Sequence, residues 1–143
     1  MAAQLTLGMI KPDAVATGKS GLIIAHLQKE GFVVRAARLV RLTRPQAERF
    51  YEVHRGRPFY PDLVAFMISG PVLPMALERE NAVAHFRTVI GATDPADAAP
   101  GTIRKLYAKS KGENAIHGSD SPETGVREVG FFFPEVELAG IWG

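Results

Sequence analysis

The strands of this chain are predicted by apolar residues that recur with a period of two or form short unbroken runs. Four segments have this character: 5–9, 32–42, 72–77 and 128–133. In the last of them, Val129, Phe131 and Phe133 would share one face. Pro74 weakens the third prediction, because proline cannot donate a hydrogen bond to a sheet ladder.

The helices are predicted by apolar residues at a spacing of three and four, together with residues that start and stop helices. Gly31 is a helix stop, and Thr43 with Gln46 has the spacing of a capping box. Ser121 followed by Pro122 marks another helix start. Helices or helical turns are therefore expected over 22–30, 43–54, 63–69, 82–90 and 102–108, and after 121.

The order of these elements predicts an α+β fold. Strand, helix, strand, helices, strand, helix and strand follow one another. This is the order of a ferredoxin-like sandwich, a four-stranded antiparallel sheet with helices packed on it. No repeat, low-complexity tract or linker interrupts the sequence, so residues 1–143 are expected to form a single domain.

Composition excludes several classes of protein. The chain has no cysteine, which rules out disulfides and thiolate metal sites and favours a reducing compartment. No run approaches the ~18 apolar residues of a membrane span, and residues 1–7 lack the features of a signal peptide. A cytoplasmic protein without a membrane partner is therefore expected. A net charge of +2 does not predict binding to nucleic acid.

The densest cluster of polar residues, 114–121, is the best candidate for chemistry. His117 is followed by Gly, Ser, Asp and Ser, which predicts a tight turn before a helix N-terminus, where anions are favoured. A neutral imidazole is a nucleophile near pH 7 if another group holds its second ring nitrogen, and Glu128 could be that group. An ordinary surface histidine in a serine-rich turn would show the same spacing.

Scattered cations could complete a phosphate site around this cluster. Lysine and arginine both suit phosphate oxygens, and several fall in loops or near the ends of predicted elements: Lys11, Arg57, Arg87 and Arg104. Tyr51 and Phe59 could offer a flat face to a nucleobase. Each cation could equally be a solvated side chain, and each aromatic ring could belong to the core.

Residues 13–20 partly match the pattern of a phosphate-binding P-loop. The segment ends in Gly18-Lys19-Ser20 after a predicted strand, but Asp13 stands where the P-loop pattern requires glycine. A carboxylate there would also repel phosphate, so a working P-loop is not expected. The absence of Gly-x-Ser-x-Gly argues against a hydrolase built on Ser119.

Several short segments match the motifs of one family. Residues 114–121, Asn-Ala-Ile-His-Gly-Ser-Asp-Ser, are similar to an active-site signature N-x-x-H-G-S-D-S without a substitution. The other matching segments are 9–14, 57–60, 67–71, 91–95 and 100–104. The match runs in order and with the expected spacing from about Leu5 to Phe133. The chain therefore resembles the nucleoside diphosphate kinases.

This resemblance implies a kinase that transfers the terminal phosphate of a nucleoside triphosphate, typically ATP, to a nucleoside diphosphate by a ping-pong mechanism. His117 would carry the phosphate, Glu128 would hold its other ring nitrogen, and Ser119 would support Glu128. Tyr51 would lie close to the nucleophile, and Lys11 would serve both catalysis and binding. The residues implied to bind the nucleotide are Lys11, Phe59, Leu63, Arg87, Thr93, Arg104 and Asn114.

The resemblance also implies Mg²⁺ on the nucleotide phosphates more than on protein ligands, and a homo-oligomer, a tetramer or hexamer built from dimers. Three positions depart from the family pattern. Leu106 stands where many members have an acidic residue, Arg79 replaces a glycine common after the third strand, and Pro74 lies inside that strand. The tail, 134–143, matches no motif.

Other classes of function stay open at this point. A ferredoxin-like binding module could keep the nucleotide cleft and lack catalysis, which an assay for conversion of ADP to ATP would decide. A P-loop ATPase would depend on Lys19, whereas a kinase acting through His117 would not. Binding to nucleic acid as a side activity would depend on salt.

Overall fold

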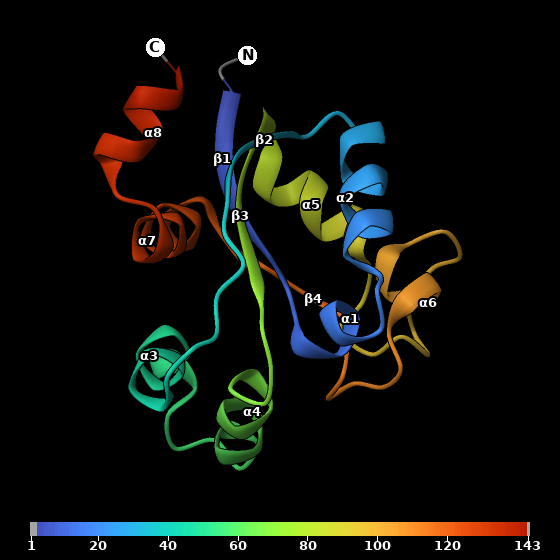
Figure 1. Cartoon of the computed structure of the whole chain (residues 1–143). Helices are drawn as coiled ribbons and strands as arrows, with labels where there is room; N and C mark the ends of the chain where they lie inside the picture. The colour runs from blue at the N-terminus through green and yellow to red at the C-terminus, as the bar shows by residue number, and fades with distance from the viewer. Residues whose placement is uncertain (1–2, 143) are drawn as a thin grey trace.

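Four strands form one antiparallel sheet in the computed structural model, which describes residues 3–142 (Figure 1). In the spatial order β2-β3-β1-β4, the strands are β2 (Val33–Ala37), β3 (Leu73–Glu80), β1 (Ala3–Ile10) and β4 (Ile116–Gly118). β1 pairs with β3 along its whole length and with β4 at its C-terminal end. The predicted α+β fold, a four-stranded antiparallel sheet with helices packed on it, is confirmed.

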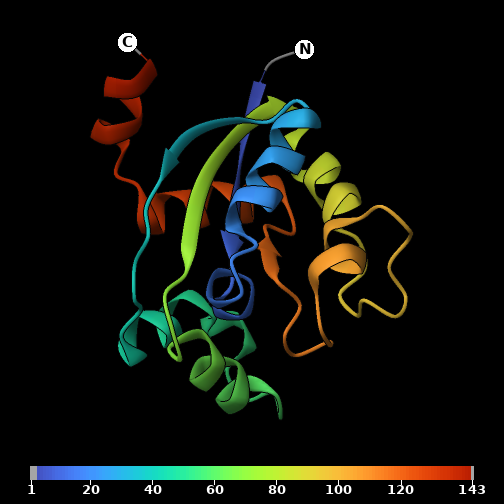
Figure 2. The same ribbon diagram turned by 45° about the vertical axis from the view of Figure 1, so that its right-hand side comes forward.

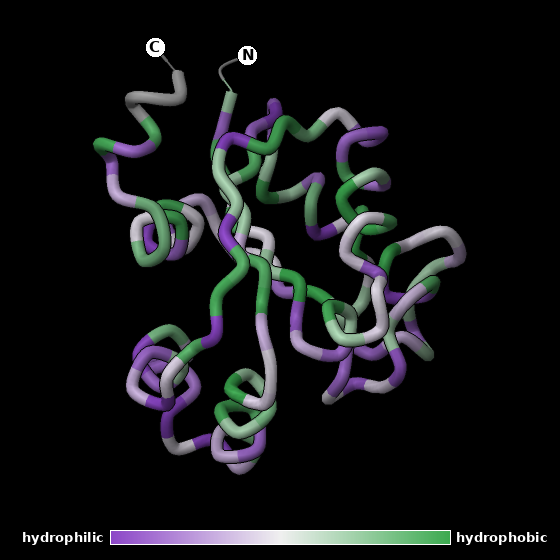
Figure 3. The backbone as a smooth tube through the Cα atoms, viewed as in Figure 1, coloured by the Kyte–Doolittle hydropathy of each residue, from purple (hydrophilic) through white to green (hydrophobic). Residues whose placement is uncertain are grey.

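Helices cover both faces of this sheet (Figure 1 and Figure 2). One face carries α1 (Pro12–Ala16), α2 (Ser20–Lys29), α5 (Ala82–Ile90) and α6 (Ile103–Tyr107). The other carries α3 (Arg44–Phe50), the 3-10 turn Glu52–His54, α4 (Tyr60–Met67), α7 (Pro122–Phe132) and α8 (Glu135–Trp142). Hydrophobic stretches run along the sheet, and hydrophilic ones lie mostly on the outer helices and loops (Figure 3).

β1 lies at the centre of the molecule and is buried on both sides. Leu7 and Met9 belong to the core under α3, α4 and α7, whereas Gly8 faces α5. Gly8 lies opposite Gly118, and a Cβ atom added at these positions would come within 2.8 and 2.7 Å of the Phe86 ring. Glycine at both positions therefore lets α5 pack directly on the β1–β4 pair.

The predicted start signals act as expected at α3 and α7. The Thr43 hydroxyl accepts the N–H of Gln46 at 3.3 Å, and the Gln46 side chain accepts the N–H of Thr43 at 2.9 Å, which is a complete capping box. Ser121 caps α7 by accepting the N–H of Thr124 at 3.1 Å, and Pro122 occupies the first turn. The sequence therefore predicts where these helices begin.

The strand predicted over 128–133 is wrong, because most of these residues form the C-terminal half of α7. Val129, Phe132 and Phe133 are buried, a spacing of three and four that belongs to a helix. The unbroken run of aromatic residues concealed this period. The fourth strand is β4, which is three residues long and contains His117.

β2 is shorter than the strand predicted over 32–42. Its pairing with β3 covers Val33–Ala37, with a bulge at Arg35, and a separate bridge joins Val40 to Val72. Pro74 is tolerated in β3 because its carbonyl accepts the N–H of Arg38 at 3.1 Å. The N–H and C=O of one residue point to the same side of a strand, so the N–H that Pro74 lacks would also lie on the β2 side, beyond the last regular β2–β3 pair. The pairing of β3 with β1 therefore loses no hydrogen bond.

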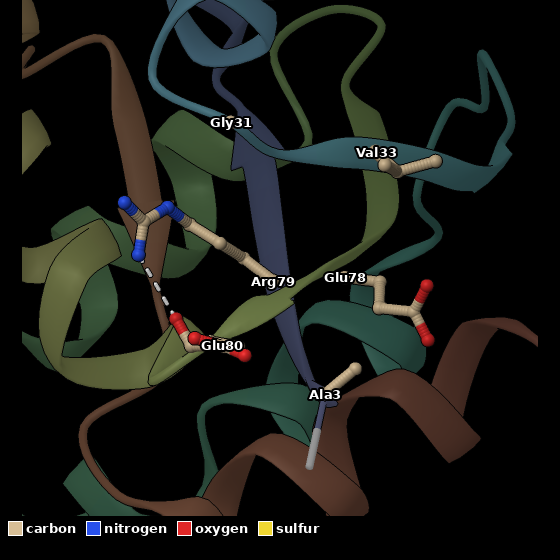
Figure 4. Close-up of a pocket in the computed structure, with 6 residues that line it drawn as sticks. All are labelled: Ala3, Gly31, Val33, Glu78, Arg79 and Glu80. Carbon is tan, nitrogen blue, oxygen red and sulfur yellow. Dashed lines mark hydrogen bonds between the residues drawn. The ribbon is translucent and has the colours of Figure 1, made fainter. Parts of the chain in front are cut away.

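Arg79 lies inside β3, and not after the third strand as expected. Its Nε donates to the Glu30 carbonyl at the end of α2 at 2.8 Å, and its guanidinium lies 5.7 Å from the centroid of the Phe32 ring. Another nitrogen donates to the Glu80 carbonyl at 2.9 Å, and the side chain borders a hollow beside β2 (Figure 4). Arg79 therefore fastens the C-terminal end of α2 to the sheet.

The tail that matches no motif forms α8, which packs against β2 of its own chain. Arg38 fastens it by donating to the Glu137 carboxylate at 2.7 Å and to the Phe132 carbonyl at 2.9 Å. Gly143, the last residue of the tail, lies outside the described residues. Within residues 3–142, no helix has both the length and the apolar character that crossing a bilayer requires.

Candidate active site

A cleft of about 760 Å³ opens beside the C-terminal end of β1, between α4, α5 and the loop that enters β4. Most of the predicted site residues line it: Lys11, Tyr51, Phe59, Leu63, Arg87, Thr93, Arg104, Asn114 and His117. Glu128 and Ser119 lie behind His117 and are hydrogen-bonded to each other. The fold therefore brings together side chains that are separated by more than a hundred positions in the sequence.

His117 lies on β4, and not in the tight turn that its sequence neighbours predict. Its Nε2 is 2.8 Å from Glu128 Oε1, whereas Nδ1 has no hydrogen-bond partner within residues 3–142. The rings of Phe50 and Tyr51 contact the imidazole edge-on, with centroids 5.1 and 5.7 Å away. The imidazole is therefore fixed on one side and keeps one nitrogen available.

Glu128 is a buried carboxylate on α7 that holds this imidazole. The Ser119 hydroxyl donates to the same Oε1 atom at 2.8 Å and accepts the N–H of Leu7 at 3.3 Å. Burial alone would raise the pKa of the Glu128 carboxyl, but the hydrogen bond and charge of His117, with the help of Ser119, outweigh burial and hold that pKa below its usual range. An ionised Glu128 accepts the Nε2 proton, so in the neutral imidazole Nδ1 is the nitrogen that carries the free lone pair.

Lys11 follows β1 directly and is almost completely buried. Its Nζ donates to Asn114 Oδ1 at 2.8 Å, and the Asn114 amide donates to the Thr93 carbonyl at 3.1 Å. Burial, followed by repulsion from Arg104, lowers the pKa of Lys11 to about 8, while the Asp13 carboxylate acts in the opposite direction. Lys11 therefore remains mostly protonated at neutral pH and presents a positive charge to the cleft.

Arg104 provides a second buried cation. Its guanidinium donates to the carbonyls of Gly91 and Ile116 at 3.0 and 2.7 Å. Burial, followed by repulsion from Arg87, lowers its pKa to about 10, so it keeps its charge at neutral pH. Leu106, which departs from the family pattern, is exposed on α6 and leaves both hydrogen bonds intact.

Tyr51 is buried beside His117, and its hydroxyl has no hydrogen-bond partner in the part of the chain that the structure describes. Burial, reinforced by the negative charge of Glu128, raises the pKa of the Tyr51 phenol far above its usual value. The phenol therefore stays neutral beside the imidazole, and its hydrogen-bond donor is unused among the described residues.

The outer part of the cleft is more exposed. Phe59, at the start of α4, is 50% exposed, and its ring centroid is 5.2 Å from that of His54. Leu63 is half-buried one turn further along α4. Arg87 forms an exposed ion pair with Asp120 at 2.9 Å. This region offers an aromatic face and an exposed positive charge.

Sequence reasoning missed several residues that line the cleft: His54, Asp62, Phe66, Lys111, Glu113 and Asp120. His54 follows Tyr51 by three positions, a helical spacing that could have placed both on one side. Arg57, one of the candidate cations, is exposed and outside the cleft lining. Residues 13–20 form α1 and the start of α2, with Lys19 as the residue before the helix, so they make no P-loop.

A family model, sequence relatives and solved structures that match this chain all point to one family. The family model for nucleoside diphosphate kinase matches residues 4–138. The nucleoside diphosphate kinase of Sorangium cellulosum is 57% identical over 139 residues, which cover 97% of this chain and 96% of that protein. The nucleoside diphosphate kinase of Chlorobium chlorochromatii is 58% identical over 93% of this chain and 95% of its own length.

Solved structures agree with these sequence relatives. The crystal structure of the Aquifex aeolicus nucleoside diphosphate kinase superposes with a TM-score of 0.93 at 45% identity, over 95% of this chain and 99% of the other. The Halobacterium salinarum nucleoside diphosphate kinase, solved in complex with CDP, superposes with a TM-score of 0.91 at 38% identity, over 95% of this chain and 91% of the other.

Proposed function

Since this chain belongs to the nucleoside diphosphate kinase family, we propose that it transfers phosphate through a covalent intermediate on Nδ1 of His117. The family's activity is transfer of the terminal phosphate of a nucleoside triphosphate to a nucleoside diphosphate, and it requires a divalent cation. The observation that carries the residue assignment is the His117–Glu128 contact of 2.8 Å at a cleft that also contains buried cations.

The proposed transfer proceeds in two half-reactions. Nδ1 of His117 donates its lone pair to the terminal phosphorus of ATP, the bond to the bridging oxygen breaks, and ADP leaves with the bond electrons. The imidazole gains positive charge in this step, and the ionised Glu128 at Nε2 stabilises it. The terminal oxygen of a second nucleoside diphosphate then attacks the same phosphorus, and His117 is regenerated. A shared site used in turn by both nucleotides gives ping-pong kinetics.

Cations stabilise the phosphate charge in this proposal. Lys11 and Arg104 are buried beside the nucleophile, and Arg87 lies at the outer part of the cleft. Fixed charges in a partly dry site cost little reorganisation when the transition state forms. The divalent cation is proposed to be Mg²⁺, which would bind the nucleotide phosphates and supply charge neutralisation there. This fits the donor set, because residues 3–142 contain no group of three or more metal-ligating side chains.

The remaining nucleotide contacts are assigned by position in the cleft. Phe59 would stack on the base with Leu63 beside it, Asn114 would contact the ribose, and Thr93 would contact a phosphate. Stacking tolerates any base, so broad nucleotide specificity is expected. Three further points stay predictions: assembly into a tetramer or hexamer built from dimers, a cytoplasmic location, and a single domain over 1–143. Light scattering would test the assembly.

The test is the phosphoenzyme itself. Incubation with [γ-³²P]ATP and Mg²⁺ should label the protein with an acid-labile, base-stable bond, and His117→Ala should abolish both the label and activity. His54→Ala, a matched control in the same cleft, should still be labelled. Survival of the label in His117→Ala would show that the nucleophile is another residue.

A nucleotide-binding module without catalysis is the main alternative. It would bind ADP and ATP yet form no ATP in a coupled assay. The ionised Glu128 behind His117 favours the kinase, since a binding site alone has no use for a carboxylate that activates an imidazole.

A further inference from the structure

The segment that carries Asn114 and His117 contains a strained backbone turn. Ala115 between them has a φ of +73° and is completely buried. Across it, the N–H of Ile116 donates to the Asn114 carbonyl at 2.9 Å. A hydrogen bond between residues two apart around such a φ defines a γ-turn of the rare, strained kind. Backbone conformations of this sort persist only where the surroundings hold them.

Both backbone groups of Ala115 are held by residues that follow β1. The Lys11 N–H donates to the Ala115 carbonyl at 2.8 Å, and Asp13 Oδ2 accepts the Ala115 N–H at 3.1 Å. Asp13 is half-buried in the first turn of α1, and its Oδ1 has no hydrogen-bond partner among the described residues. Without this carboxylate, the buried Ala115 N–H would lose its acceptor, which is unfavourable.

We propose that Asp13 is a positioning residue for phosphoryl transfer, because its carboxylate holds the turn at Ala115 and so sets both Asn114 and His117. This inference rests on the proposed role of His117. Asn114 is the partner of the Lys11 ammonium, and His117 follows the turn by two residues. A relaxed turn would therefore displace His117 and disturb the hydrogen bond that holds the Lys11 ammonium. In the sequence, Asp13 is recognisable as part of the matching segment 9–14 and as the residue that breaks the P-loop pattern, but neither feature indicates a contact with Ala115.

A second effect of Asp13 must be separated from this one. Its negative charge raises the pKa of Lys11, against the lowering by burial, so it could act on the phosphate site by charge alone. Asparagine keeps an oxygen acceptor and removes the charge, whereas alanine removes both. Because both substitutions remove the charge and so lower the pKa of Lys11 alike, a difference between their rates at pH 6.5 reports the oxygen acceptor and not the titration of Lys11.

The test measures the rate and the final amount of His117 phosphorylation by rapid quench at saturating ATP and Mg²⁺. Asp13→Ala should slow phosphorylation about 10- to 100-fold, because a small displacement of a reacting group costs that much. The final amount of phosphoenzyme should stay at the wild-type level, which a partly unfolded protein would not reach. Asp13→Asn should retain the rate within about threefold, since it keeps the acceptor.

A second substitution tests the turn directly. Ala115→Gly should phosphorylate within about threefold of wild type, because glycine adopts positive φ without strain. In that background, Asp13→Ala should cost only about fivefold, since the two residues act on one turn and their effects are not additive. Circular dichroism and thermal melting of all four variants establish that each is folded.

The outcomes separate the hypotheses. The positioning role would be overturned if Asp13→Ala slowed phosphorylation equally with and without Ala115→Gly. It would also be overturned if Asp13→Asn were as slow as Asp13→Ala. If Asp13→Ala does not fold, Asp13→Asn decides alone: a rate near wild type supports the acceptor role, and a tenfold loss refutes it. A wild-type chain that forms no phosphohistidine would instead remove the proposed function, and this inference with it.

Discussion

The floor of the cleft and its mouth are built in opposite ways. The floor consists of buried side chains that are hydrogen-bonded within the protein: Lys11, Arg104, Asn114 and, behind His117, Glu128. The mouth consists of exposed side chains, of which Phe59 is 50% exposed and Arg87 forms an exposed ion pair with Asp120. Exposed ion pairs of this kind fix a side chain weakly.

This difference matches two separate tasks. Phosphoryl transfer needs charges and a nucleophile that are already in place, because reorganisation during the reaction raises the barrier. Admission of different nucleotides needs a surface that makes few directional demands on the base. We therefore expect substitutions in the floor to lower the rate of phosphorylation and substitutions in the mouth to weaken binding.

Apart from changes to His117 itself, the substitution expected to slow phosphorylation most is at Glu128, in the floor of the cleft. Glu128→Gln keeps the shape of the side chain and an oxygen for the Nε2 proton, but it removes the negative charge that stabilises the phosphorylated imidazole. We expect phosphorylation of His117 to slow about 100-fold, the order of general-base and charge effects. Single-turnover labelling measures it.

The control for that variant is Glu123→Gln, an exposed substitution of the same type on the same helix. It should leave the rate within about twofold of wild type. A Glu128→Gln enzyme that phosphorylates at the wild-type rate would show that the floor carboxylate is structural, and the contrast with the mouth would lose its main support.

The second predicted effect is a pH dependence of kcat/KM that arises from Lys11, in the floor of the cleft. Burial and repulsion from Arg104 lower the pKa of Lys11 to about 8. The protonated form binds phosphate, so kcat/KM for ATP should fall about tenfold per pH unit above that pH. The loss occurs on the alkaline side because the active form of lysine is the protonated one.

Asp13→Asn provides the matched control for this profile. The Asp13 carboxylate raises the pKa of Lys11, so its neutralisation should move the alkaline limb to lower pH. Initial rates between pH 6.5 and 9.5 in both enzymes measure the shift. If kcat/KM fell at the same alkaline pH in Asp13→Asn as in the wild type, the fall would have to come from a group other than Lys11.

The sequence predicts the mouth and the floor to different degrees. Phe59, Arg87 and the motif around His117 are visible because local residue types carry the signal. The strand over 128–133 was a wrong prediction, and with it the placement of Glu128, because consecutive aromatic residues fit a strand and a helix alike. The helix start at Ser121 was the better guide, since its capping hydrogen bond is local.

Long-range contacts in the floor have no local signal. Asp13 and Ala115 are 102 positions apart, and only the pairing of β1 with β4 places them within hydrogen-bond distance. Ser119 reaches the Leu7 backbone in the same way, across 112 positions. Pattern and propensity describe neighbours in the chain, so such contacts cannot be derived from them. For the same reason Arg79, which interacts with the end of α2, could be recognised in the sequence only as a departure from a motif.

The smallest effect is expected at the mouth, where Phe59 is proposed to stack on the base. Phe59→Ala should raise KM for ATP about fivefold and leave the maximal phosphorylation rate within about twofold, because stacking by a half-exposed ring contributes on the order of 1 kcal/mol. Phe59→Trp should restore binding, and Val53→Ala, an exposed apolar substitution outside the cleft lining, should change neither constant. Stacking acts equally on the ground state and the transition state, so it lowers KM without raising kcat. A large fall in the phosphorylation rate of Phe59→Ala would mean that the mouth also orders the floor, and the division of tasks proposed for the two regions would then be wrong.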